Sequence, residues 1–198
     1  MKKILVCVVL LVFAVSFLPA LGAADSSAQG SSGTNAVFPI LNHFSAREFT
    51  TEPVTAEELN TIVTAGLRAP SAGNRQPWLF TVVQDVDLMQ QILPQATEGN
   101  ILIVVSGAGD GRTNGPVILD CALAAQSMFF ASQALGLGAR QYTNPGLIER
   151  TNNLKTELGM PEDNNAVIVT RFGRLPAGVD VVSSASPRAD PEEKVIYR

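Results

Sequence analysis

The order of hydrophobic and polar residues along the chain shows two patterns, one of which predicts helices and the other strands. A capping box, Thr55-Ala-Glu-Glu58, precedes apolar residues at helical spacing and predicts a helix that ends before Pro70. Apolar, β-rich runs predict buried strands at residues 78–83, 101–105 and 167–172, and a short terminal strand at 195–197. Further helices are predicted around residues 37–41, 88–93, 116–135 and 147–158. Strands interleaved with helices indicate one layered α/β or α+β domain.

The predicted helix at residues 116–135 is apolar on nearly all sides. Leu119 and Leu123 share one face, Met128 and Phe129 extend the apolar surface to other sides, and Gly136 is suited to end the helix. A helix that is hydrophobic all round is normally buried on every side. We therefore expect it to lie in the centre of the molecule or at the interface of a dimer.

The first residues have the features of a secretory signal peptide. Lys2 and Lys3 precede an apolar run that extends to Leu18, and small residues follow between Ala20 and Ala24. A membrane anchor is the alternative, but the run is short and no basic cluster follows it. We predict a signal peptide at 1–23, a flexible Ser/Gly-rich linker at 24–35 and one domain at 36–198. The protein would then be exported, periplasmic or secreted, without stable membrane insertion.

Composition narrows the function classes. The 198-residue chain is 46% hydrophobic and 16% charged, which provides for a core and leaves too little charge for disorder. Its 14 basic residues are outnumbered by 18 acidic ones and form no basic run, so no nucleic-acid partner is expected. One His and two Cys are too few for a zinc finger, an iron–sulfur centre or a disulfide framework, and no metal site is predicted. Apolar neighbours of Cys121 indicate a buried, inert thiol.

Common phosphate-binding and catalytic motifs are absent or incomplete. Ser106-Gly-Ala-Gly-Asp-Gly-Arg112 resembles a dinucleotide fingerprint, but Arg112 stands where the third Gly is required. No Walker sequence occurs, and the one His has no partners that form a triad. The stretch from Arg68 to Trp78 is more informative, because it holds polar side chains in an irregular segment between a helix and a strand. By composition alone, an ordinary helix–strand connection fits that stretch equally well.

Several motifs follow one another in the order of a known enzyme family. His43-Phe-Ser-Ala-Arg-Glu-Phe49 is similar to a motif Arg-Arg-Ser-x-Arg-x-Phe, and Ala69-Pro-Ser-Ala-Gly-Asn-Arg-Gln-Pro-Trp78 to a motif Ala-Pro-Ser-x-x-Asn-x-Gln-Pro-Trp. Asp120-Cys-Ala-Leu-Ala-Ala-Gln-Ser looks like the family's central helix, and Ser186-Pro-Arg188 like part of its last third. Together these motifs resemble the FMN-dependent nitroreductase family over about residues 37–197. The chain departs from the first motif at His43 and Phe44, where the family has basic residues.

The resemblance implies an α+β fold with a central, mostly antiparallel sheet flanked by helices. It also implies an intertwined homodimer with one FMN at each subunit interface. Matched by position, Ser45, Arg188 and His43 would face the FMN phosphate, and Arg47 the ribityl chain or the pyrimidine edge. The loop residues that would hold the polar edge of the ring are Pro70, Ser71, Asn74 and Gln76. Thr143 and Asn144 fall where backbone N–H groups meet the flavin N5.

The same resemblance implies an oxidoreductase, which the predicted signal peptide would direct to export. It would transfer a hydride from NAD(P)H, or another donor, through FMN in a ping-pong cycle to a nitroaromatic, a quinone or a similar flat aromatic acceptor. No catalytic side chain is expected, because the flavin carries the chemistry. Two alternatives stay open: a flavin-binding or electron-transfer module without turnover of its own, and a divergent dehalogenase or flavin-degrading relative.

Overall fold

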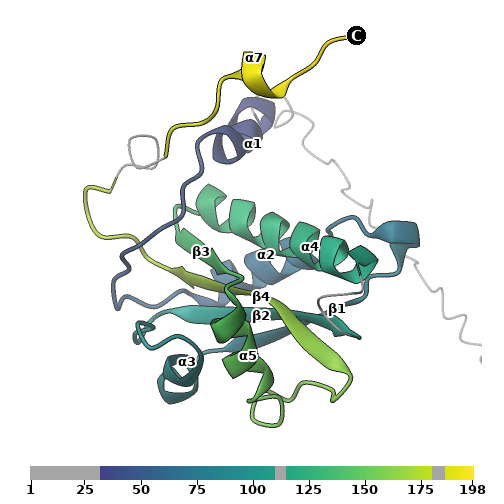
Figure 1. Ribbon diagram of the computed structural model, residues 1–198. Coiled ribbons are helices and arrows are strands. Elements are labelled where there is room, and N and C mark those ends of the chain that lie inside the picture. The colour runs from purple at the N-terminus through teal and green to yellow at the C-terminus, as the bar shows by residue number, and fades with distance from the viewer. Residues whose placement is uncertain (1–31, 110–114, 180–185) are drawn as a thin grey trace, which may run out of the picture. The chain divides into compact units, whose positions relative to one another are not determined.

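The computed structural model describes residues 32–109, 115–179 and 186–198 of the chain. The predicted signal peptide and most of the predicted linker lie outside the described residues. In the described part, four strands form one antiparallel sheet in the order β1-β2-β4-β3 (Figure 1). These strands are β1 (Trp78–Val83), β2 (Ile101–Ala108), β3 (Gly138–Tyr142) and β4 (Asn164–Gly173).

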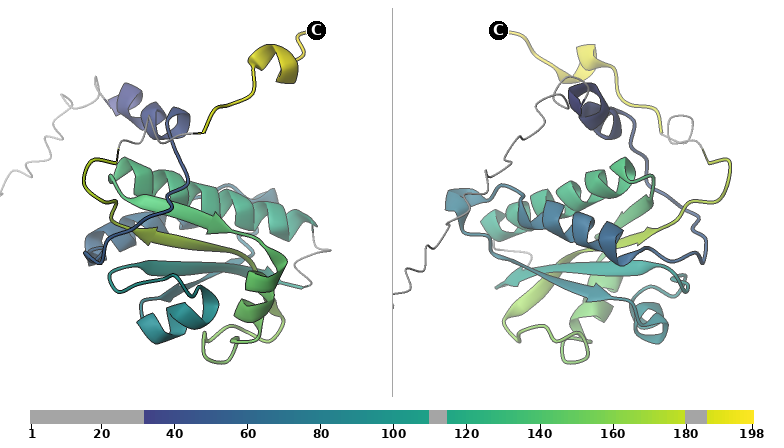
Figure 2. Two further views of the ribbon diagram at one scale, coloured as in Figure 1. Left: turned by 60° about the vertical axis from the view of Figure 1, so that its left-hand side comes forward. Right: turned by 180° about the vertical axis from the view of Figure 1, so that it is seen from behind.

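Helices cover both faces of this sheet. On one face lie α2 (Ala56–Leu67) and α4 (Gly115–Ala134), and on the other α3 (Val86–Ile92) and α5 (Pro145–Asn152) (Figures 1 and 2). The other helical segments of the described chain are α1 (Ser32–Leu41), the 3-10 helix η2 (Ala72–Asn74) and α7 (Pro191–Lys194). The predicted α+β fold with an antiparallel sheet is thereby confirmed.

The central strand β2 contributes to two hydrophobic cores, because successive side chains of a strand point to opposite faces. Ile101, Ile103 and Val105 pack with residues of α2 and α4, whereas Leu102 and Val104 pack with residues of α3 and α5. All five are at most 2% exposed. Burying each such side chain stabilises the fold by about 1.5–3 kcal/mol. The sheet is therefore a rigid support between two layers of helices.

Helix α4 packs in the core, as its sequence predicted, but only one of its faces is buried. Cys121, Ala124 and Met128 are fully buried against the sheet and α2. Within the described residues, α4 is the one helix long and apolar enough to cross a membrane, and this packing gives its apolar residues a role in the core. Its outer face is different, because Leu119 is 66% and Leu123 is 45% exposed.

Strand β3 was not predicted, and the predicted terminal strand at residues 195–197 is wrong. The sequence of β3, Gly-Ala-Arg-Gln-Tyr, contains no β-branched residue and two polar ones, so its pattern carries no strand signal. It forms because its backbone pairs with the long strand β4. Residues 195–197 are exposed and have no strand conformation, since no strand in the described part of the chain pairs with them.

Two helices differ in length from their prediction. Helix α1 begins at Ser32, inside the segment predicted as a flexible linker. Helix α5 ends at Asn152, whereas the apolar pattern predicted a helix over residues 147–158. The Asn152 side chain accepts a hydrogen bond from the Ala166 N–H at 2.8 Å. This contact fastens the end of the helix to β4, and the chain continues in turns.

Candidate functional site

The extended segment between α1 and α2 lies against the ends of β3 and β4. The Ala46 N–H donates to the Ala139 carbonyl at 2.9 Å, and the Thr50 N–H donates to the Arg174 carbonyl at 2.9 Å. Phe44 and Ala46 are buried, whereas Ser45 and Arg47 are exposed. This alternation is the pattern of an extended chain with one buried side. It presents Ser45 and Arg47 together on the outer side.

Two glycines allow this segment to approach the sheet. Gly138 and Gly173 pair directly across β3 and β4. A Cβ atom on Gly138 would lie 3.0 Å from the Ala46 Cβ, and one on Gly173 would lie 2.9 Å from the Phe49 Cδ1. Both distances are shorter than ordinary carbon–carbon contacts of about 3.5–4.0 Å. Added Cβ atoms would also meet the Leu175 Cδ2 at 2.5 Å and the Asn100 Nδ2 at 2.8 Å, so the close approach of the segment leaves no room for a side chain at either glycine.

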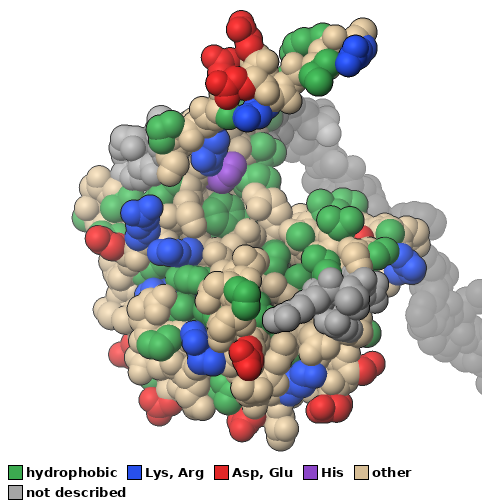
Figure 3. Space-filling model, in the orientation of Figure 1, with side chains coloured by type: hydrophobic (Ala, Val, Ile, Leu, Met, Phe, Trp, Pro, Cys, Tyr) green, Lys and Arg blue, Asp and Glu red, His purple; other side chains and the backbone are tan. Residues whose placement is uncertain are grey.

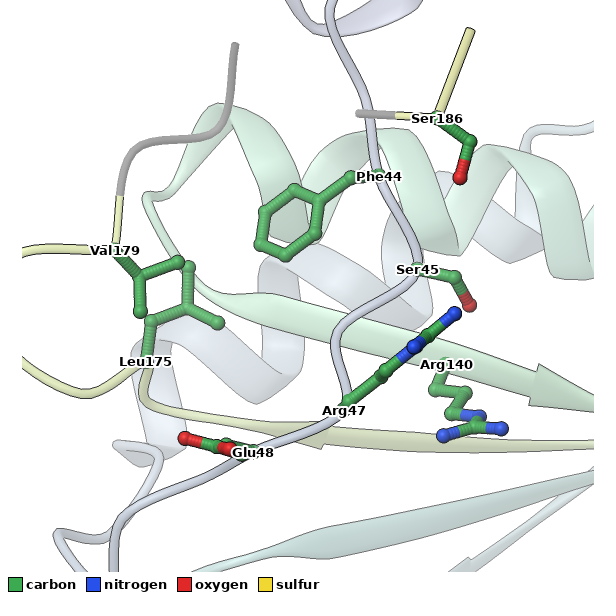
Figure 4. A pocket seen from close by; sticks show the side chains of 8 residues that line it. All are labelled: Phe44, Ser45, Arg47, Glu48, Arg140, Leu175, Val179 and Ser186. Atoms are coloured by element: carbon green, nitrogen blue, oxygen red, sulfur yellow. The ribbon is translucent and has the colours of Figure 1, made fainter. Parts of the chain in front are cut away.

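A cavity of about 420 Å³ opens between this segment, β3 and the chain after β4. Its lining residues are Phe44, Ser45, Arg47, Glu48, Arg140, Leu175, Val179 and Ser186. In the close-up, Arg47 and Arg140 lie on the same side of the cavity and Glu48 lies on the opposite side (Figure 4). The volume is within the range of about 300–1,000 Å³ that small-molecule sites occupy. We call it the β3 cavity.

The polar groups of the β3 cavity are suited to an anion. Two guanidinium groups and two hydroxyls, from Ser45 and Ser186, line it together with one carboxylate. Within the described residues, neither Arg47 nor Arg140 makes an ion pair. In the space-filling view, basic side chains gather below and to the left of His43 (Figure 3). Guanidinium groups bind carboxylates and phosphates through paired hydrogen bonds.

The predicted loop at residues 70–76 holds its own shape through short-range hydrogen bonds. The Gln76 N–H donates to the Ser71 hydroxyl at 3.0 Å, and the Gln76 side-chain amide donates to the Asn74 side chain at 3.2 Å. Asn74 and Gln76 both have positive φ, 53° and 48°, which is uncommon for residues other than Gly. Strain of this kind persists only where neighbouring bonds hold it, and it is frequent at ligand sites. Pro70, Asn74 and Gln76 are exposed.

A buried carboxylate of α4 anchors this loop. Asp120 is 4% exposed, and its Oδ1 accepts a hydrogen bond from the Ala72 N–H at 3.0 Å. Its Oδ2 is buried and has no hydrogen-bond partner within the described chain. The next residue, Cys121, is fully buried, and burial together with the charge of Asp120 raises the pKa of its thiol to about 11. The loop is thus fixed to the start of the central helix, beside an unreactive cysteine.

His43 lies outside the set of residues that line the β3 cavity. Its Nδ1 is 2.8 Å from the Ile40 carbonyl, so Nδ1 donates a hydrogen bond to the last turn of α1. Its ring makes edge contacts with Phe129 and Phe130 of α4, with centroids 5.8 and 5.2 Å apart. These contacts hold His43 at the end of α1, and its phosphate contact stays a prediction.

The remaining predicted residues are exposed. Arg188 follows residues outside the described range, and its guanidinium donates to the Ser186 carbonyl at 3.3 Å, which places it close to one cavity residue. Thr143 and Asn144 connect β3 to α5, and Asn144 precedes the first turn of that helix. The structure brings Ser45 and Arg47 together in the cavity, whereas η2 and the segment after α1 lie at opposite ends of α4 (Figures 1 and 2).

Comparison with known proteins decides the family. The sequence profile of the nitroreductase family matches residues 40–108. A protein of Archaeoglobus fulgidus that carries the name NADH dehydrogenase/NAD(P)H nitroreductase is 30% identical over 142 residues, which span 68% of this chain and 82% of the relative. The chain belongs to the nitroreductase family.

Solved structures agree with this membership. A Bacteroides thetaiotaomicron protein of the same name is 26% identical, has a TM-score of 0.69 and is matched over 84% of this chain and 98% of its own. An NADPH:FMN oxidoreductase of Vibrio harveyi, in complex with NAD+, is 25% identical with a TM-score of 0.68, over 82% of this chain and 76% of its own. The nitroreductase-like fold that the motifs implied is confirmed.

Three residues that shape the β3 cavity or the loop were not predicted from the sequence. Arg140 lies in the strand that sequence patterns missed, so nothing marked its side chain as part of a cavity. Ser186 belonged to a recognised motif, but only Arg188 was selected from it. Asp120 also belonged to a motif, and its signal was an acidic residue in an otherwise apolar helix. A buried carboxylate needs a partner, and that requirement could have pointed to the loop.

Proposed function

We propose that this chain transfers electrons from a nicotinamide donor, through FMN, to a flat aromatic acceptor such as a nitroaromatic or a quinone. Its family makes the chain an oxidoreductase with FMN as its cofactor. The observation that carries the finer proposal is the β3 cavity, where Ser45 and Arg47 meet a second guanidinium. A nicotinamide donor is supported by the Vibrio harveyi enzyme, whose structure contains NAD+.

The residues present fit the polar parts of FMN. The cations and hydroxyls of the β3 cavity suit its phosphate. The side-chain amides of Asn74 and Gln76, held by the strained loop, suit the donors and acceptors of its pyrimidine ring. Thr143 and Asn144 lie at the end of β3, where their backbone N–H groups are proposed to meet the flavin N5.

When bound, FMN supplies hydride and electron transfer between the donor and the acceptor. The chain's own residues then need only bind and orient, because no proton has to be taken up by a side chain. Positioning two flat molecules in turn on one ring is worth several kcal/mol of the barrier without any catalytic acid or base.

We also propose a homodimer in which each cofactor site is shared between two subunits. None of the loop residues lines the β3 cavity of its own chain, and the two regions lie at opposite ends of α4. A second copy could place its loop over the cavity. Leu119 and Leu123 of α4, together with Leu67 of α2, are exposed apolar residues that such a pairing would cover.

Mixed dimers test whether the site is shared. Arg47→Ala removes a cavity cation and Asn74→Ala removes a loop amide, so each variant alone should bind FMN poorly. If the site is shared, a mixed dimer has one site with both defects and one site with none. Unfolding and refolding an equal mixture should then restore about a quarter of wild-type FMN binding, since half the dimers are mixed. No recovery would place the whole site within one subunit.

Sedimentation tests the dimer itself. The purified wild-type protein should have twice the mass of one chain. Leu119→Glu should convert it to a monomer with unchanged helix content, because a charge at an exposed position costs nothing until a partner covers it. A wild-type monomer that binds FMN tightly would contradict the proposed dimer.

Turnover separates an enzyme from a flavin carrier. The purified protein should be yellow, and NADH or NADPH should bleach the flavin absorbance under nitrogen. Addition of nitrofurazone or a benzoquinone should restore the absorbance and consume more nucleotide in repeated cycles. Bound flavin that neither nucleotide reduces would favour an electron-transfer module that is served by another donor.

Export is proposed from the sequence of the first residues alone. Lys2 and Lys3, the apolar run to Leu18 and the small residues after it are typical of a cleaved signal peptide. Mass spectrometry of the mature protein should find its first residue between Leu21 and Asp25. Recovery of chains that start at Met1 from a soluble cytoplasmic fraction would contradict export.

A further inference from the structure

Two arginines face each other across neighbouring strands of the sheet. Arg140 of β3 pairs directly with Arg171 of β4. Residues in such register lie side by side on one face, and like charges in that position destabilise the sheet. Arg171 is 4% exposed, and Arg140 is half-buried, so water screens the repulsion incompletely.

Neutral groups surround Arg171. Its Nε donates to the Asn100 Oδ1 at 2.7 Å, and its guanidinium lies 4.3 Å from the centre of the Phe49 ring. Burial lowers the pKa of Arg171, the Tyr142 hydroxyl raises it and the charge of Arg140 lowers it. Within the described residues, Arg171 has no carboxylate partner. The fold therefore keeps a buried cation here, with a second cation opposite it.

Arg140 is the one of the two that reaches the β3 cavity. It lines the cavity with Ser45 and Arg47, and its guanidinium also lies 5.3 Å from the centre of the Tyr142 ring. An aromatic ring beneath a guanidinium limits its motion and keeps its paired N–H groups available. His43, at the position where the first motif has its leading Arg, is bonded to Ile40 instead.

We propose that Arg140, together with Arg47, binds the phosphate monoester of FMN. This inference rests on the proposed function, because it assigns the β3 cavity to the phosphate end of the cofactor. A dianionic phosphate between Arg47 and Arg140 would neutralise a charge that the isolated chain leaves unmatched. The repulsion between Arg140 and Arg171 then destabilises the flavin-free protein, and a bound phosphate offsets this destabilisation.

The comparison of FMN with riboflavin isolates the phosphate. Arg140→Gln should weaken FMN binding about tenfold to a hundredfold, which is the range for a lost hydrogen bond to a charged group. Riboflavin, which has no phosphate, should bind the variant as it binds the wild type. Arg140→Lys should give an intermediate loss, because an ammonium keeps the charge without the paired N–H groups. Arg150→Gln is the matched control, since Arg150 is exposed on α5 and lies outside the cavity.

Stability of the flavin-free protein distinguishes ligand binding from a structural role. Removing one of two facing cations should leave the thermal midpoint of Arg140→Gln unchanged or raise it by about 1–4 °C. FMN should raise the thermal midpoint of Arg140→Gln by less than it raises that of the wild type. A fall in the flavin-free midpoint, with equal weakening of FMN and riboflavin, would show that Arg140 only supports the fold and would overturn the proposal.

Two further outcomes separate this inference from the proposed function. If the wild type binds FMN and Arg140→Gln binds it equally well, the assignment of Arg140 fails while the function stands. If Arg140→Gln leaves FMN binding unchanged but raises the KM for NADPH relative to that for NADH, the cavity holds the donor's phosphate, and the proposal is overturned. Absence of FMN binding by the wild type would overturn both.

Discussion

The strained loop at residues 70–76 and the β3 cavity differ in how their polar groups are satisfied. In the loop, Ser71, Asn74 and Gln76 bond to one another, and Asp120 fixes the backbone from below. In the cavity, Arg47 and Arg140 have no acidic partner within the described residues. The polar groups of the loop are therefore bonded within the described part of the chain, whereas the positive charges of the β3 cavity have no negative partner there.

This difference indicates two ways of preparing a binding site. A loop whose backbone is held by its own bonds presents amides in fixed directions, so little ordering is needed when a ring arrives. A cavity whose cations have no acidic partner is instead less stable until an anion enters. Sites where a chain departs from its own stability rules are the expected places for function. Four experiments test how far the contrast holds.

The largest expected effect concerns Cys121, beneath the loop. Its thiol is fully buried, and its pKa is raised to about 11 by burial and by Asp120. At pH ~8 this lowers the thiolate fraction by more than about a hundredfold against an ordinary thiol with a pKa near 8.5. Alkylation of the native protein by iodoacetamide, followed by mass spectrometry, should be slower by at least that factor than alkylation in urea. Rapid native modification would show that this end of α4 opens.

The second experiment removes the anchor of the loop. Asp120→Ala deletes the acceptor of the Ala72 N–H, so the loop loses its tie to α4. A hydrogen bond to a charged group contributes about 1.5–3 kcal/mol, and we expect FMN affinity to fall at least tenfold. Fluorescence titration of FMN measures the loss. Asp120→Asn is the matched control, because its side-chain oxygen can still accept the bond, and it should retain most of the affinity.

The contrast between the two regions also explains what the sequence could predict. The loop was found because its Pro and Gly residues belong to a recognisable motif. Its polar side chains also form hydrogen bonds with residues only a few positions away. Strands β1, β2 and β4 were found because each contains a continuous apolar, β-rich run. The capping box of α2 was found and is present, with the Glu58 N–H donating to the Thr55 hydroxyl at 3.2 Å.

The β3 cavity could not be predicted in the same way. Arg140 enters it from a strand whose own sequence has weak strand propensity and which forms only by pairing with β4. The cross-strand register that sets Arg140 against Arg171 depends on that pairing. His43 was selected by its position in a motif, yet its contacts with Ile40 and Phe130 come from the packing of α1 and α4. Contacts between distant segments therefore decide this half of the site.

The third experiment separates strain from chemistry in the loop. Gln76 has φ of 48°, a conformation that costs an L-residue roughly 1–2 kcal/mol and costs Gly almost nothing. Gln76→Gly and Gln76→Ala both remove the amide, so both should weaken FMN binding. Only the glycine variant relieves the strain, and urea unfolding should find it about 1 kcal/mol more stable than the alanine variant. Equal stabilities would mean that the loop relaxes and its shape is not imposed.

The smallest expected effect tests an arginine that is matched, in contrast to Arg140. Arg174, at the end of β4, pairs with Glu52 at 2.9 Å and with Glu58 at 3.0 Å. Burial raises the pKa of Glu58, but hydrogen bonds from Thr55 and Arg174 outweigh it and hold this pKa below its usual value of 4.5. The pKa of Glu58 is lower in the folded state than in the unfolded state, so its contacts stabilise the protein fully above pH 4.5. This stabilisation is lost as the pH falls through the pKa of the folded state.

Urea unfolding at neutral pH and at about pH 3 measures this contribution. Wild type should lose a few tenths to about 1 kcal/mol more than Glu58→Gln over that interval, since solvent screening limits pairs this close to the surface. Glu52→Gln is the control, because its side chain is 68% exposed and should behave like wild type. Equal losses in wild type and Glu58→Gln would mean that the carboxylate contributes nothing. The contact between Arg174 and Glu58 would then add no stability, although it is present in the structure. The contrast between a paired Arg174 and an unpaired Arg140 would fail.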